Sequence, residues 1–125
     1  MACIMIIEDE AGFREMLKNA LLRRKYSIIE ASDGKEARLR FKASIVDLVV
    51  TDILMPEEDG LKVIMKLKEI KPDIKIIAIS GGGKAGPGNY LNLAKALGAD
   101  DILFKPFSLN MLINRIEDLL NPEKP

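Results

Sequence analysis

Apolar residues follow two patterns that take turns along this chain. Short, nearly continuous apolar runs that stop abruptly at polar residues are typical of strands in a buried parallel sheet. Longer stretches in which apolar residues recur at helical spacing are typical of helices with one buried face. The runs predict strands at residues 3–7, 26–31, 47–51, 74–79 and 102–104.

The stretches that follow these runs predict five helices. Gly98 should end the fourth helix, and Ser108 should cap the last one. Residues 81–89 hold five of the nine glycines and should form a loop. The residues expected on the buried faces are Phe13, Met16, Leu17, Ala20 and Leu21; Ala37 and Phe41; Leu61, Ile64 and Leu67; Tyr90, Leu93, Ala94 and Leu97; and Leu109, Leu112, Ile113, Ile116 and Leu120.

Strands that alternate with helices at this spacing imply a parallel sheet with helices on both faces. The predicted fold class is therefore α/β, a three-layer α/β/α sandwich with a five-stranded parallel sheet and five helices. A chain of 125 residues with 48% hydrophobic content suits a single core. Residues 1–121 should form that domain, and residues 122–125 should form a polar tail.

Composition and charge narrow the functions open to such a domain. Basic and acidic residues number 19 each, so no net charge attracts nucleic acid or an anionic membrane. The chain contains no histidine, which removes the commonest transition-metal ligand and excludes a phosphohistidine donor. The single cysteine, Cys3, has no disulfide partner and suits a reducing compartment. No apolar run approaches the roughly 20 residues that span a bilayer, so we expect a cytoplasmic protein.

Chemically reactive residues stand where four of the predicted strands end. Glu8 and Asp9 follow the first strand, Asp52 follows the third, Ser80 the fourth and Lys105 the fifth. Ligands of open parallel sheets bind beyond the carboxyl ends of the strands, so these side chains should converge. The second strand ends without such a group, which suits a strand at the edge of the sheet.

Three carboxylates close together would repel one another unless a cation neutralised them. Oxygen ligands without histidine favour a hard cation, and Mg²⁺ is expected because it binds one or two carboxylates and bridges to phosphate. We expect Asp9 and Asp52 as direct ligands and Glu8 as a ligand through water.

Asp52 is also a candidate nucleophile, because a carboxylate can form an aspartyl phosphate. Lys105 would hold the charge that develops on the transferred phosphoryl group. The Ser80 hydroxyl would donate to a phosphoryl oxygen, and Gly81 would let the backbone approach closely.

These residues, in this order, resemble the response-regulator receiver family of two-component signalling over essentially the whole chain, in the manner of a chemotaxis-type single-domain receiver. The motif comprises Glu8 and Asp9; Asp52, Met55, Pro56 and Gly60; Ser80; and Lys105, Pro106 and Phe107. The resemblance implies a flavodoxin-like sheet ordered 2-1-3-4-5, the Leu54 carbonyl as a metal ligand and a cis bond before Pro106. It also implies a sensor histidine kinase or phosphotransfer protein as donor, and a downstream protein partner or output domain as target.

One position departs from the family. Receivers usually carry an aromatic switch residue three positions before the lysine, where this chain has Ile102. We therefore expect the glycine-rich segment after Ser80, with Gly81, Gly82 and Gly83, to reorganise on phosphorylation instead. The switch candidates are thus Ser80, these glycines and Ile102.

Other functions stay open on the sequence alone. Gly81, Gly83 and Gly86 spell a dinucleotide-binding fingerprint, but it follows the fourth strand instead of the first. A phosphohydrolase would need a second aspartate where Leu54 stands, so the chain should be a switch and not an enzyme, with at most slow dephosphorylation of its own. A receiver-like module that is never phosphorylated is the alternative. No DNA-binding segment fits after the last helix, so we expect no direct contact with nucleic acid.

Overall fold

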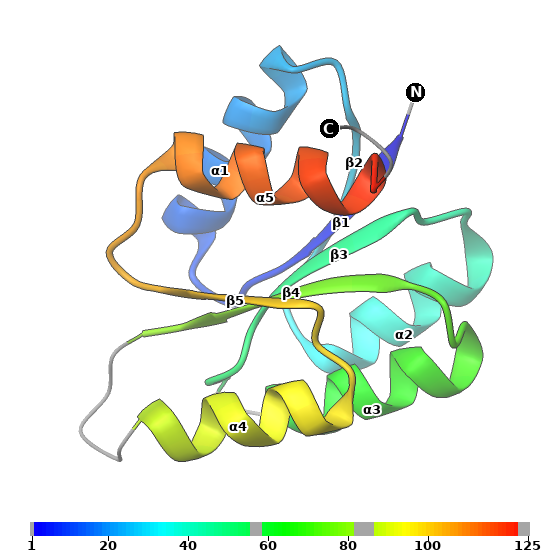
Figure 1. Ribbon diagram of the computed structural model, residues 1–125. Coiled ribbons are helices and arrows are strands. Elements are labelled where there is room, and N and C mark those ends of the chain that lie inside the picture. The colour runs from blue at the N-terminus through cyan, green and yellow to red at the C-terminus, as the bar shows by residue number, and fades with distance from the viewer. Residues whose placement is uncertain (1, 56–58, 82–86, 123–125) are drawn as a thin grey trace.

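The computed structural model describes residues 2–55, 59–81 and 87–122, with the side chains of 87–91 excepted. Within these residues strands and helices alternate along the chain (Figure 1). The elements are β1 (Cys3–Ile7), α1 (Ala11–Arg23), β2 (Ser27–Ala31), α2 (Gly34–Ala43), β3 (Leu48–Asp52), α3 (Gly60–Ile70), β4 (Lys75–Ser80), α4 (Pro87–Leu97), β5 (Asp101–Phe104) and α5 (Leu109–Leu120).

The strands form one parallel sheet in the order β2-β1-β3-β4-β5, which confirms the predicted fold class and the edge position of β2. Helices α1 and α5 cover one face, and α2, α3 and α4 cover the other (Figure 1). Successive residues of a strand serve opposite faces: Ile4 and Ile6 pack under α1 and α5, whereas Met5 and Ile7 pack on the other side. This two-sided burial explains why the strands are continuous apolar runs.

Three expectations about individual elements are wrong. The segment 81–89 is not a loop throughout, because α4 begins at Pro87, where a helix loses nothing by a missing N–H. Met16 and Leu93 were expected to be buried but are 44% and 51% exposed. Both lie at the margin of an apolar stripe, about a quarter turn from its centre. The side chain of Tyr90 lies outside the described residues.

Local contacts fix the ends of the helices. Ser108 caps α5 as expected, since its Oγ accepts a hydrogen bond of 3.0 Å from the Met111 N–H. Gly98 follows α4 with φ at 118°, a backbone conformation that other residues rarely adopt. At the start of α3, a Cβ on Gly60 would lie 2.5 Å from Ile53 Cα and 2.6 Å from the Asp52 carbonyl oxygen. Only glycine allows α3 to begin so close to the end of β3.

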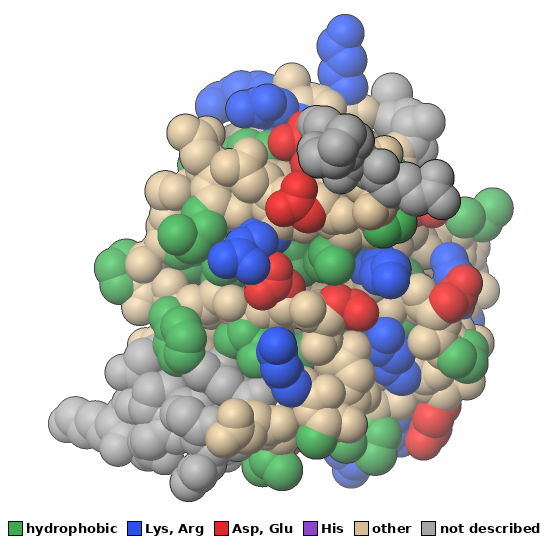
Figure 2. Space-filling view, viewed as in Figure 1, with side chains coloured by type: hydrophobic (Ala, Val, Ile, Leu, Met, Phe, Trp, Pro, Cys, Tyr) green, Lys and Arg blue, Asp and Glu red, His purple; other side chains and the backbone are tan. Residues whose placement is uncertain are grey.

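Charged side chains of both signs are interspersed on the face shown in Figure 2, in agreement with the balanced composition. None of the helices in the described part of the chain combines the length and the hydropathy that a bilayer crossing requires.

Candidate functional site

Three charged side chains from three strands meet at the carboxyl edge of the sheet. The Lys105 ammonium lies 3.2 Å from Asp52 Oδ2 and 3.4 Å from Glu8 Oε1. Asp52 and Glu8 are only 6% and 2% exposed. Since β1 and β3 pair as far as Ile7 and Thr51, the residues that follow these two are neighbours, and the segment after β5 brings the lysine to them.

Backbone groups fix both buried carboxylates. Asp52 Oδ1 accepts a hydrogen bond of 2.9 Å from the Leu54 N–H, and Glu8 Oε2 accepts one of 3.1 Å from the Glu10 N–H. Glu8 is anchored further through its backbone, because its carbonyl accepts a bond of 2.7 Å from Arg14 Nη1. These hydrogen bonds hold the Asp52 and Glu8 carboxylates in fixed positions at the edge of the sheet.

The acidic residues have the chemistry of a cation site. One carboxylate oxygen from each of Glu8, Asp9 and Asp52 lies within 4.8 Å of the others, with Asp9 exposed to solvent. Such a set of hard oxygen ligands, open to water on one side, fits Mg²⁺, which keeps several waters in its shell. The expectation that the Leu54 carbonyl is a further ligand stays a prediction.

Burial dominates the electrostatics of Glu8. It raises the pKa of this carboxyl from its ordinary 4.5 to about 7, and the neighbouring Asp52 charge adds to the rise. The Glu10 N–H and the Lys105 ammonium oppose the rise without cancelling it. For Lys105, burial works against the charged form, but the carboxylates of Asp52 and Glu8 outweigh it and raise the pKa. The lysine is therefore a permanent cation near neutral pH.

Ser80 ends β4, beside Asp52. Its neighbour Ile79 pairs with Asp52 in the sheet, and Ser80 itself is 2% exposed. The Ser80 carbonyl accepts a hydrogen bond of 2.8 Å from the Lys105 N–H, so the strand ends that carry both residues are joined. The cis peptide bond between Lys105 and Pro106 confirms what the family resemblance implied.

The switch candidates lie in different surroundings. Ile102 is partly buried and packs against the cluster beneath α2, α3 and α4, opposite Ala78 in the sheet. Gly81 is exposed, and a Cβ there would meet no atom of the described residues within 4 Å. Gly82 and Gly83 lie outside the described residues, as do Gly86 and Pro56.

The site includes an aromatic contact that the sequence patterns did not predict. Lys105 Nζ lies 4.3 Å from the centroid of the Phe13 ring, which had been assigned only to the buried face of α1. The Phe13 ring meets Phe107 edge-on, with centroids 6.2 Å apart and planes at 78°. The contact could have been predicted from the position of Phe13 in the sequence. Phe13 stands in the first turn after Asp9, at the same edge of the sheet as the acidic residues.

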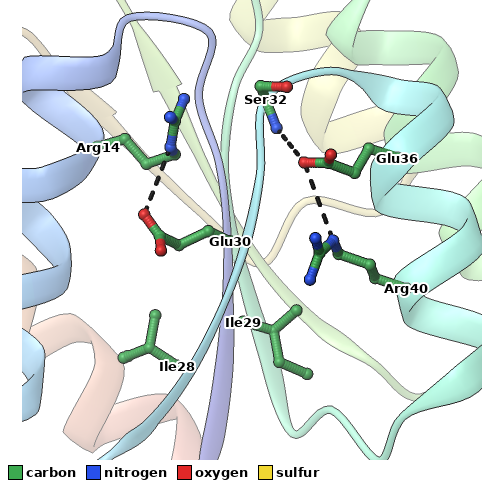
Figure 3. A pocket seen from close by; sticks show the side chains of 7 residues that line it. All are labelled: Arg14, Ile28, Ile29, Glu30, Ser32, Glu36 and Arg40. Atoms are coloured by element: carbon green, nitrogen blue, oxygen red, sulfur yellow. Dashed lines mark hydrogen bonds and ion pairs between the residues drawn. The ribbon is translucent and has the colours of Figure 1, made fainter.

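A groove of about 410 Å³ lies along the edge strand β2 (Figure 3). Its charged side chains form one ion pair on each side of β2: Arg14 Nε lies 3.4 Å from Glu30 Oε1, and Arg40 Nε lies 3.9 Å from Glu36 Oε1 within α2. Charges on an edge strand hinder its pairing with other chains. We therefore interpret the groove as a protected edge and not as a ligand site.

A family model and curated relatives both match nearly the whole of this chain. A family model described as the response regulator receiver domain matches residues 4–117. Chemotaxis protein CheY of Bacillus subtilis is 33% identical over 119 residues, which cover 94% of this chain and 97% of that protein. The probable transcriptional regulator ycf27 of Pyropia yezoensis is 37% identical over 117 residues, but the chain spans only 46% of it.

Solved structures share the fold. A CheY-like receiver domain protein of Methanospirillum hungatei superimposes with a TM-score of 0.91 at 21% identity, covering 98% of this chain and 96% of that one. Response regulator TrrA of Thermotoga maritima, in complex with Mg²⁺ and BeF, has a TM-score of 0.84 at 32% identity, covering 96% of this chain and all of that one (100%).

Proposed function

The chain belongs to the family of response regulator receiver domains, and on this premise we propose that Asp52 accepts a phosphoryl group from a sensor histidine kinase or a phosphotransfer protein. The observation that carries the proposal is the position of Asp52. Its carboxylate is buried at the end of β3, 3.2 Å from the Lys105 ammonium and beside two further carboxylates.

In the proposed reaction, a carboxylate oxygen of Asp52 attacks phosphorus in line with the phosphohistidine of the donor. A P–O bond forms, the P–N bond breaks, and the imidazole nitrogen takes its electron pair. Lys105 then binds an oxygen of the transferred group, and the Ser80 hydroxyl donates to another. The Leu54 N–H, bonded to Asp52 Oδ1, keeps the carboxylate oriented during the attack.

We propose Mg²⁺ as the cofactor of this site. Asp9, Asp52 and the Leu54 carbonyl would bind it directly, and Glu8 would bind through water. When bound, Mg²⁺ would supply positive charge that offsets the negative charge of the carboxylates and of the transferred phosphoryl group. The acidic cluster of this chain supports the assignment, and so does the relative from Thermotoga maritima that was solved with Mg²⁺ and BeF.

The proposed product is a signalling state and not a turnover intermediate. Leu54 stands where a phosphohydrolase would need a second aspartate, so hydrolysis of the aspartyl phosphate should be slow. Phosphorylation would reorganise the segment that begins with Gly81, Gly82 and Gly83, and thereby alter the surface that a downstream protein partner or output domain binds. Ile102 has no aromatic ring to rotate, which supports this route of switching.

Phosphate incorporation from acetyl phosphate tests the proposal. The wild type should be labelled stably in the presence of Mg²⁺, and Asp52→Asn should not be labelled. The exposed aspartate Asp118, on α5, supplies the matched control, since Asp118→Asn should label as the wild type does. Rapid release of phosphate would favour a hydrolase, and no labelling of the wild type would favour the unphosphorylated interaction module.

A hydrogen-exchange experiment tests the proposed switch segment. Amides of residues 81–89 should change their exchange rates when Mg²⁺ and beryllofluoride are added to the wild type. Unchanged exchange in this segment, together with changes elsewhere, would refute that route of switching.

A further inference from the structure

One side chain of the site contacts a group that the proposed chemistry does not use. Lys105 Nζ lies 4.3 Å from the centroid of the Phe13 ring, in addition to its contacts of 3.2 Å with Asp52 and 3.4 Å with Glu8. We propose that Phe13 is a positioning residue that holds the Lys105 ammonium beside Asp52, ready for the phosphoryl group. This inference rests on the function proposed above.

Lys105 needs such a contact because of its own flexibility. A lysine side chain has four rotatable bonds and a compact, strongly hydrated charge, so it loses much conformational freedom when it is held in place. The face of an aromatic ring attracts a cation at this distance and also excludes water from one side of it. The Lys105 side chain is 29% exposed, so most of it is already removed from solvent.

The ring itself is held firmly. The Glu10 side chain accepts a hydrogen bond from the Phe13 N–H and so fixes the first turn of α1. The ring meets Phe107 edge-on at 6.2 Å, and both rings pack against the cluster beneath α1 and α5. Because Phe107 follows Lys105 by two residues, this pair joins α1 to the segment that carries the lysine.

Packing alone does not require an aromatic residue at this position. Leu17 and Leu21 fill the buried stripe of α1 with aliphatic side chains, and each is 1% exposed or less. A leucine at position 13 would continue that stripe equally well. What leucine lacks is the π face that lies beneath the ammonium.

The experiment compares Phe13→Leu, Phe13→Tyr and Phe41→Leu. Phe41 is 5% exposed in the cluster beneath α2, so its replacement controls for the general cost of losing a buried ring. The first readout is the NMR signal of the Lys105 side chain in metal-free protein. The second is the affinity for beryllofluoride in the presence of Mg²⁺.

Phe13→Leu should remove the ring-current shift of the Lys105 side-chain signals and weaken beryllofluoride binding about 3- to 10-fold. Phe13→Tyr should preserve both, and Phe41→Leu should lower stability while leaving both readouts unchanged. In a Lys105→Met background, Phe13→Leu should cause no further loss of affinity.

The contrary results distinguish failure of the proposed function from failure of the positioning role. If the wild type does not bind beryllofluoride, the proposed function fails, and this inference fails with it. If the wild type and Phe13→Leu bind it equally well, only the positioning role is refuted. An equal loss in the Lys105→Met background would show that Phe13 acts through packing, and this also refutes the role.

Discussion

Replacing Glu8 with glutamine should make the stability of the metal-free protein much less dependent on pH. The Glu8 side chain is 2% exposed, and burial is the main reason that its pKa rises from 4.5 to about 7. Glutamine has nearly the same shape but carries no proton that it could release in this range. The substitution therefore isolates the contribution of one titrating group.

The direction of this pH dependence follows from the number of protons that the folded and the unfolded states bind. Between pH 4.5 and about 7, unfolded chains release the Glu8 proton while folded chains retain it. The free energy of unfolding of the wild type therefore falls as the pH rises through this window and levels off above it. A rise of the pKa from 4.5 to about 7 corresponds to a total loss of up to about 3.5 kcal/mol, at about 1.4 kcal/mol per unit.

Urea unfolding in the presence of a chelator measures this effect. The free energy of unfolding of Glu8→Gln minus that of the wild type should be higher at about pH 8 than at about pH 4.5, by up to about 3 kcal/mol. Glu69, an exposed residue of α3, supplies the control, since Glu69→Gln should follow the wild-type pH dependence. Parallel curves for Glu8→Gln and the wild type would refute the account of the buried carboxyl.

Three further outcomes are expected. Gly60→Ala should destabilise the protein by about 1–3 kcal/mol in urea unfolding, because its Cβ would meet Ile53 Cα at 2.5 Å. Gly12→Ala is the control and should not destabilise the protein, because its Cβ would meet only the Glu10 carboxylate. Equal effects of the two substitutions would contradict the steric explanation. Mg²⁺ should raise the thermal midpoint of the wild type but raise that of Asp9→Asn less, and an unchanged response would exclude Asp9 as a ligand. Ser108→Ala should cost about 1 kcal/mol through its lost cap, measured by thermal unfolding, and no loss would show the cap to be dispensable.

Much of the fold follows from local patterns in the sequence. The run at Cys3–Ile7 has the bounds of β1, and Ser108 caps α5, because both depend on neighbours along the chain. Local patterns do not predict features that depend on how the elements pack against one another. The exposure of Met16 depends on how α1 is rotated against the sheet, and glycines and Pro87 are compatible with a loop and with the start of a helix alike.

The candidate site was predictable to the extent that it obeys a rule of topology. The strands of a parallel sheet end at one edge, so Glu8, Asp52 and Lys105 could be assigned to a common region without any distances. The sequence does not contain the distances. Glu8 and Lys105 are 97 positions apart, yet their charged atoms lie 3.4 Å from each other.

By itself, then, the sequence determined the α/β architecture, the chemical types gathered at the edge of the sheet and the family to which they point. Tertiary structure decided that Glu8 is buried enough to titrate near pH 7 and that the Phe13 ring lies against the Lys105 ammonium. The reason is physical: strand and helix patterns arise between near neighbours in the chain. Desolvation and contacts between side chains depend on atoms that only the folded chain brings together.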